Sequence, residues 1–357
     1  MYKFHKNFKE KGSALLVVIF TISILLIIGL AILEMITNET LMASYLADQT
    51  KACYLAEAGI RETLAMLKQD PDYKYSSIWF DFLSKNHTLG EGSYKISIED
   101  LGKGCVKISS LANVSKAKVE IQVEAYASTV NPVFYNALSV DNEIFSYKIK
   151  VYGDVYANGD VSIKSPAKVY GNLKATGKTT GKSNVSGKVE DDAVCIDFPD
   201  FEEDVYKKSA KRRYIGDYFD DELFISDVMF VDGNVTVNSI GGDGALYATG
   251  NIYVRDGRIT KGGSGYPLII SPKGIILKNC GESEKLRVSG ILFSKNISFP
   301  KGENVLLNGS AIAEDINLNE NIDISYDTAI LNNKKYLLPG CSKVHVYILS
   351  WYQKGTN

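Results

Sequence analysis

The segment SALLVVIFTISILLIIGLAIL, residues 13–33, contains no charged residue. At 1.5 Å per residue, a helix of this length is roughly 31 Å long, which matches the thickness of the hydrocarbon core of a membrane. A helix that is apolar on all sides over such a length is rare inside a soluble protein. The segment therefore predicts one transmembrane helix, around which the rest of the chain is arranged.

Charged residues on the two sides of this segment predict its orientation. Lysines precede it at positions 3, 6, 9 and 11, whereas Glu34, Glu39 and Asp48 follow it. Because positively charged flanks stay on the cytoplasmic side, we expect a single-pass protein with a cytoplasmic N-terminus and an exported C-terminal part. A secretory signal peptide is the alternative, but its apolar core usually spans only about 7–15 residues.

The helical pattern continues beyond the apolar segment. Residues 34–68 lack proline, and Glu57 and Arg61 are spaced as an i,i+4 ion pair in the favourable order. Apolar residues recur at steps of roughly three and four, at Leu41, Tyr45, Ala52, Leu55, Ile60, Leu64 and Leu67. We expect one helix of about 55 residues, apolar over 13–33 and amphipathic over 34–68. An ordinary signal peptide does not continue into such a helix.

This combination resembles the type IV pilin-like proteins. More specifically, GSALLVVIF (12–20) and LAEAGIRETLA (55–65) resemble the PilX-type minor pilins, and the resemblance covers about residues 9–68. It implies that residues 1–12 are a leader, which a prepilin peptidase removes between Gly12 and Ser13. It also implies methylation, and packing of the helix against other pilin or pseudopilin subunits in a filament or secretion machine.

The fifth residue after Gly12 departs from the pattern of the major pilins. Those proteins have a glutamate there, which pairs with the N-terminal ammonium of a neighbour, whereas this chain has Val17. An unpaired charge in a nearly dry helix bundle costs several kcal/mol. We therefore expect a low-copy minor subunit. Three small residues, Ala52, Ala56 and Gly59, are expected to permit close contact between helices. Glu57 is the central residue of the Ala-Glu-Ala motif, residues 56–58, that contributes to the resemblance.

Residues 69–130 predict a small antiparallel sheet packed on the amphipathic half of the helix. Apolar and polar residues alternate over 92–99 and 117–128, and a third strand-like run covers 105–111. Gly102 and Gly104 supply the first turn. This arrangement resembles the headgroup of pilins.

Residues 131–353 contain imperfect repeats of a short β-rich unit. The repeats are YGDVYANGDVSI (152–163), YGNLKATGKT (170–179), GALYATGNIYV (244–254), SGILFSKNISF (289–299) and NGSAIAEDINL (308–318). A repeat of about 18 residues with Gly, Asn or Asp at its corners predicts a parallel β-solenoid. The fold class is therefore α+β, and a β-sandwich is the alternative for this domain.

Two segments of this domain depart from the repeat. Residues 190–228 form a charged insertion or flank with a short helix, after which the solenoid is expected to resume at about residue 230. Residues 323–353 are expected to supply a last turn and a final strand that caps the solenoid.

Motifs that carry enzyme chemistry are absent from the sequence. It has three histidines, no P-loop, no G-x-S-x-G and no H-E-x-x-H, and its five cysteines form no C-x-x-C pair. We expect no catalytic site, no metal, no cofactor and no small-molecule substrate. The acids Asp154, Asp160, Asp315 and Asp323 are expected to be turn residues, because equivalent positions carry Asn172, Asn251 and Asn296.

Two basic stretches, 164–188 and 207–213, raise contact with DNA or a surface glycan as a hypothesis. Acidic residues flank the second stretch, so a solvated charged face is the favoured interpretation. A rival function is a signal-anchored surface protein that acts on or binds polysaccharide, which paired carboxylates on an open solenoid face would favour. The sequence as a whole favours a membrane-anchored minor pilin or pseudopilin that displays its solenoid outward.

Overall fold

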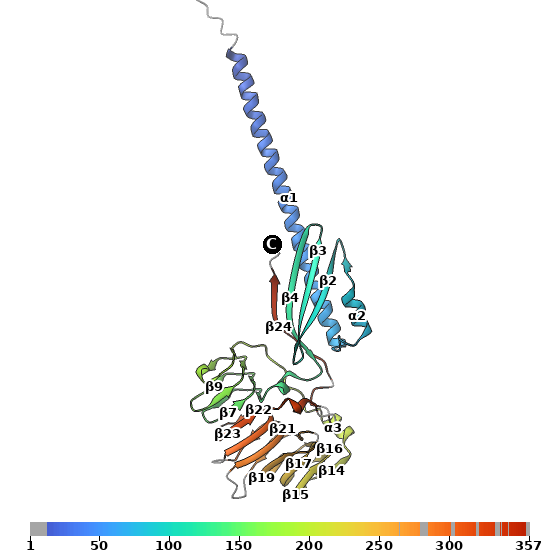
Figure 1. Cartoon of the computed structure of the whole chain (residues 1–357), viewed down its shortest axis with the longest axis vertical. Coiled ribbons are helices and arrows are strands. Elements are labelled where there is room, and N and C mark those ends of the chain that lie inside the picture. Colours follow the sequence, from blue (N-terminus) through green and yellow to red (C-terminus); the bar gives the residue numbers. More distant parts are fainter. Residues whose placement is uncertain are drawn as a thin grey trace, which may run out of the picture.

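The computed structural model describes residues 13–263, 265–278, 285–300, 304–318, 321–332, 336, 338–341 and 343–354. A long helix leads into a small sheet, here called the headgroup, and a parallel β-solenoid of about 10 turns lies beyond it (Figure 1). This confirms the predicted fold class, with a solenoid rather than a sandwich as the second domain.

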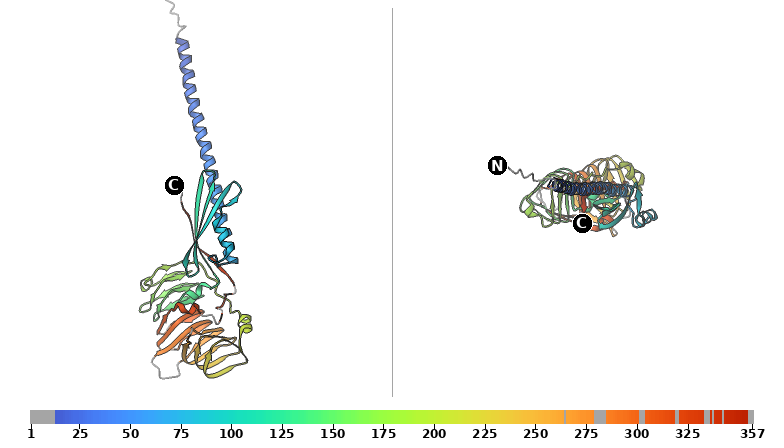
Figure 2. Two further views of the ribbon diagram at one scale, coloured as in Figure 1. Left: turned by 45° about the vertical axis from the view of Figure 1, so that its right-hand side comes forward. Right: turned by 90° about the horizontal axis from the view of Figure 1, so that it is seen from above.

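Helix α1 runs without interruption over Ser13–Gln69. From Leu15 onward it is long and apolar enough to cross a membrane. Its N-terminal part projects away from all other elements, whereas its C-terminal part lies against the headgroup sheet (Figures 1 and 2). The long helix expected from residues 13–68 is therefore confirmed.

The headgroup is an antiparallel sheet of five strands in the order β1-β2-β3-β4-β24. Its strands are β1 (His87–Leu89), β2 (Gly92–Gly102), β3 (Cys105–Val114), β4 (Ala117–Ser128) and β24 (His345–Lys354), and helix α2 (Ser77–Ser84) flanks it. The alternation in the sequence places Tyr94, Ile96 and Ile108 on the buried face. On that face they join a core that includes residues of α1.

Strand β24 corrects one expectation. The C-terminal strand was predicted to cap the solenoid, but it pairs antiparallel with β4 along its length, with Val346 beside Ala127 and Trp351 beside Val123. The headgroup is thus completed by the C-terminal segment, and the whole solenoid is inserted between two adjacent strands of one sheet.

The solenoid strands all pair in parallel. The first half contains β5 (Leu138–Val140), β6 (Ile144–Ser146), β7 (Lys150–Tyr152), β8 (Val155–Ala157), β9 (Val161–Ile163), β10 (Lys168–Tyr170), β11 (Leu173–Ala175), β12 (Thr179–Thr180) and β13 (Val189–Glu190). The second half contains β14 (Arg212–Ile215), β15 (Tyr218–Ile225), β16 (Val228–Asp232), β17 (Val235–Gly242), β18 (Ala245–Ala248), β19 (Ile252–Lys261), β20 (Leu268–Leu277), β21 (Lys285–Ser298), β22 (Asn304–Asn317) and β23 (Asn321–Ser325). Short 3-10 helices cover Pro132–Tyr135, Lys182–Asn184 and Thr328–Asn332.

The two halves of the solenoid join within a single turn, which we call the split turn. Strand β5 lies beside β22, and β7 lies beside β23, although these strands are far apart in the sequence. At the join, the Ala311 amide donates to the Ala137 carbonyl (3.0 Å), and the Tyr326 amide donates to the Tyr152 carbonyl (2.9 Å). The chain therefore enters and leaves the solenoid at neighbouring points inside the stack, next to the two headgroup strands that it connects.

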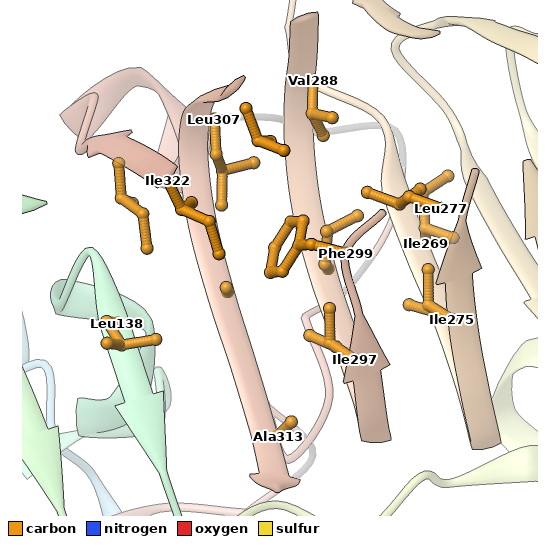
Figure 3. Close-up of a cluster of buried hydrophobic side chains, with 14 of the residues drawn as sticks. Leu138, Ile269, Ile275, Leu277, Val288, Ile297, Phe299, Leu307, Ala313 and Ile322 are labelled. Atoms are coloured by element: carbon orange, nitrogen blue, oxygen red, sulfur yellow. The ribbon is translucent and has the colours of Figure 1, made fainter. Parts of the chain in front are cut away.

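Aliphatic side chains from both halves fill the solenoid interior. Leu138 from the first half lies in the same cluster as Ala313 and Ile322 from the second (Figure 3). All three are fully buried. Because one continuous core crosses the join, the two halves form one folded unit rather than two domains.

The segment predicted as an insertion over 190–228 is shorter than expected. Strands β14 and β15 form a regular turn of the solenoid, with Arg212 beside Met229 and Tyr218 beside Val235. The segment between β13 and β14 runs along the outside and contains helix α3 (Glu203–Ser209). Its Tyr206 ring stacks on Tyr247 with 5.3 Å between ring centroids, which covers an apolar outer face of the second half.

Candidate functional site

The predicted processing site and its surroundings lie at the start of α1. Gly12 lies outside the described residues, and Ser13 is the first residue of the helix. Val17 is 61% exposed, and the other large apolar residues from Leu15 to Leu33 are 43–70% exposed. A helix with such a surface is compatible with a membrane anchor.

The apolar surface of α1 extends past the predicted membrane segment. Between that segment and the headgroup the helix exposes Met35, Ile36, Leu41, Met42, Tyr45 and Leu46, each about half exposed or more. Contiguous apolar surface of this kind marks a site of contact with other molecules or with membrane. The described part of this chain supplies no cover for it.

The three small residues of α1 face the headgroup instead of a neighbouring helix. Ala52 and Ala56 are fully buried within this chain, and Gly59 is buried beside them. A Cβ atom at Gly59 would lie 2.6 Å from Ser110 Oγ and 2.7 Å from Tyr94 Cδ2. The expectation that these residues form contacts between subunits is therefore corrected, because their small size brings the helix close to its own sheet.

Glu57, which follows Ala56 in the sequence, is only partly exposed, with 29% of its side chain accessible. Its carboxylate accepts a hydrogen bond from Arg61 at 2.7 Å, and the Arg61 side chain is 74% exposed. An exposed i,i+4 pair contributes only a few tenths of a kcal/mol to stability. The spacing in the sequence had predicted this pair.

The acidic residues of the solenoid corners hold successive turns together. Asp154 Oδ1 accepts hydrogen bonds from the Asn172 amide (2.9 Å) and side chain (3.1 Å), and Asp160 Oδ1 accepts one from the Lys178 amide (2.7 Å). Asp315 accepts from Asn142 at 3.0 Å. These contacts agree with the turn interpretation for Asp154 and Asp160. The turn interpretation is wrong for Asp315 and Asp323, because Asp315 lies within strand β22 and Asp323 within strand β23.

Asp154 also connects the solenoid to the headgroup. Its carboxylate lies 3.0 Å from Lys103 Nζ, which stands in the β2–β3 turn. Burial opposes ionisation of this carboxyl, but hydrogen bonds from Asn172 and Lys103 outweigh it and lower its pKa. Asp154 is therefore a charged contact between the two domains.

A cavity of about 160 Å³ lies where the headgroup meets the first half of the solenoid. Its walls include Tyr126 and Tyr347 from the headgroup, Tyr135 from the connection and Tyr156 from the solenoid. A second cavity of about 220 Å³ adjoins it, with Asp154, Lys174 and Glu190 lining both. Because the lining comes from segments far apart in the chain, no local sequence pattern could have identified this site.

Cysteine and metal chemistry is not evident in the part of the chain that the structure describes. Cys53, Cys105, Cys195 and Cys341 are free there, and Cys280 lies outside it. Within the same residues, no group of three or more His, Cys, Asp or Glu side chains is placed to hold a metal ion.

No protein-family model and no curated protein matches the chain. Among solved structures, it is similar to the competence-associated pilin ComZ from Thermus thermophilus, with 13% sequence identity. That similarity covers 86% of this chain and 97% of the ComZ chain, with a TM-score of 0.37. At these values the similarity does not assign the chain to a family.

Proposed function

We propose that the chain is a minor pilin or pseudopilin-like structural subunit without catalytic activity. A prepilin peptidase cuts it after Gly12, and α1 then holds it in the membrane until a motor draws it into a helical filament. The solenoid is displayed on the outer side. The chain is a minor subunit because Val17 supplies no carboxylate to pair with the N-terminal ammonium of a neighbouring subunit.

The observation that carries this proposal is the division of α1 into two differently exposed parts. One continuous helix presents an exposed apolar surface from Leu15 to Leu46, and then packs Ala52 to Leu67 into a compact sheet. A plain anchor requires only the length of a bilayer, roughly 20 residues. The exposed apolar residues beyond that length are accounted for by packing against the helices of other subunits.

The mature N-terminus tests the proposal. Mass spectrometry of the protein from membranes of a host with a prepilin peptidase should find Ser13 as the first residue. Gly12→Ala should leave Met1 in place, whereas Gly29→Ala, which adds a methyl group where no atom lies within 4 Å, should be cut normally. An intact wild-type Met1, or a cut beyond Leu33, would refute the proposal and leave a surface-anchored β-solenoid protein as the better account.

A further inference from the structure

The two adjoining cavities form a groove that begins between the headgroup and the solenoid and continues along the solenoid, and it combines aromatic walls with paired charges. We propose that this groove binds a neutral saccharide. The inference rests on the proposed display of the solenoid outside the cell, and it adds a ligand class and a site to that function.

The aromatic part of the groove is held rigidly. Tyr126 packs at 6.3 Å from Tyr135, at an interplanar angle of 74°, and at 6.3 Å from Tyr347, at 44°. Its hydroxyl donates to the Val130 carbonyl, and the Tyr156 hydroxyl donates to the Val194 carbonyl at 3.0 Å. Tyr126 and Tyr156 are almost fully buried, at 3% and 2% exposed, so they hold the wall in place, and the partly exposed rings of Tyr135 and Tyr347 supply the apolar contact for a ligand.

The polar part consists of two lysine–carboxylate pairs. Lys103 lies 3.0 Å from Asp154, and Lys174 lies 3.3 Å from Glu190. The lysine side chains are 59% and 48% exposed, so the pairs stand at the mouth of the groove. Asn172 and Lys188 line its far end. Carboxylates accept hydrogen bonds and ammonium groups donate them, so neighbouring hydroxyl groups of one ligand find both kinds of partner.

This combination selects among ligand classes. The lining carries three lysines, Lys103, Lys174 and Lys188, against the two carboxylates. Lys103 and Lys174 are each already paired with a carboxylate, so a phosphate or carboxylate ligand would have to displace Asp154 or Glu190 from its lysine. A purely apolar ligand would strip water from the two ion pairs without replacing their hydrogen bonds, which is costly. A saccharide offers apolar ring faces to the tyrosines and hydroxyl groups to the paired charges, and pockets with mostly apolar walls and a few polar groups are the usual form of small-ligand sites. The cavity of about 160 Å³ suits one sugar ring, and a second ring would extend into the adjoining cavity.

Titration calorimetry of the full chain in lipid nanodiscs tests the proposal, with maltotriose and chitotriose as neutral probes and sialyllactose as an acidic one. We expect a neutral probe to bind with a Kd of about 1 mM or tighter. Lys174→Ala should weaken that binding roughly tenfold, through loss of a charge-assisted hydrogen bond. Lys168→Ala is the matched control, because Lys168 is exposed on β10 and lines neither cavity.

Three results would overturn the proposal: no saturable binding of either neutral probe, binding that Lys174→Ala leaves unchanged, or binding of sialyllactose alone. Tyr135→Ala tests the aromatic side of the groove in the same binding measurement. An unchanged thermal unfolding midpoint in each variant shows that the fold is intact. Because the groove lies outside α1, failure to bind sugar would leave cleavage after Gly12 unaffected. Failure of cleavage would likewise leave this measurement valid.

Discussion

Replacing Gly59 with alanine distinguishes two roles for the small residues of α1. If Gly59 served contacts between subunits, the variant would change assembly and leave the isolated protein as stable as before. In the structure Gly59 lies against its own sheet, so we expect Gly59→Ala to destabilise the headgroup of the single chain.

The magnitude follows from two opposing effects. Alanine in place of a helical glycine gains about 1 kcal/mol in helix propensity. Its Cβ, however, would lie under 3.0 Å from side-chain atoms of Ser110, Tyr94 and Ile96, and overpacking a core costs about 1–3 kcal/mol. All three neighbours belong to the buried sheet, so they have little room to move. We expect a net loss of about 1 kcal/mol.

Urea unfolding followed by tryptophan fluorescence measures this loss. Both tryptophans, Trp79 on α2 and Trp351 on β24, belong to the headgroup, so the signal reports that domain. A loss of about 1 kcal/mol lowers the midpoint by roughly 0.5 M for a slope near 2 kcal/mol per molar urea. Adding Ser110→Ala should recover part of it, since Ser110 Oγ is the nearest atom to the new methyl group. A midpoint for Gly59→Ala at or above that of wild type and of the Gly29→Ala control would refute the reasoning.

Three further predictions concern the solenoid. Cysteines replacing Asp323 and Lys150, which lie beside each other across the split turn, should form an oxidative cross-link detectable by non-reducing electrophoresis. The pair at Asp323 and Lys168, one turn farther apart, should not. The lowered pKa of Asp154 contributes stability above its unfolded value of about 3.9, and this is lost as pH falls through the lower folded value. Acid unfolding below about pH 4 should therefore be less steep in Asp154→Asn, and an unchanged profile would contradict this contribution. Ile324→Ala, in the fully buried core, should cost about 2–5 kcal/mol in chemical unfolding, and a loss under 1 kcal/mol would contradict the continuous core.

Much of the fold could be predicted because its signals are local. The apolar run of residues 13–33 predicts a helix that needs no tertiary partner, since its length and composition alone suit it to a membrane. The alternation in residues 92–99 gives a strand with one buried face. Even the turn at β14 and β15 left a signal, because Gly216-Asp217 repeats Gly233-Asn234 at the spacing of one turn. The charged side chains that face outward from β15 obscured this repeat in the sequence.

What only the tertiary structure decided is which distant segments become neighbours. The sequence around Leu138 and Ala311 does not indicate that these two residues pair, because any parallel strand of alternating residues offers the same backbone hydrogen bonds. The split turn depends on where the chain turns back, and the pairing of β24 with β4 depends on both ends of the solenoid emerging together. The burial of Gly59 and the tyrosine-lined groove follow from those placements. The local pattern of apolar, polar and turn residues determined the helices and strands. The pairing of distant segments determined which surfaces of those elements are buried and which are exposed.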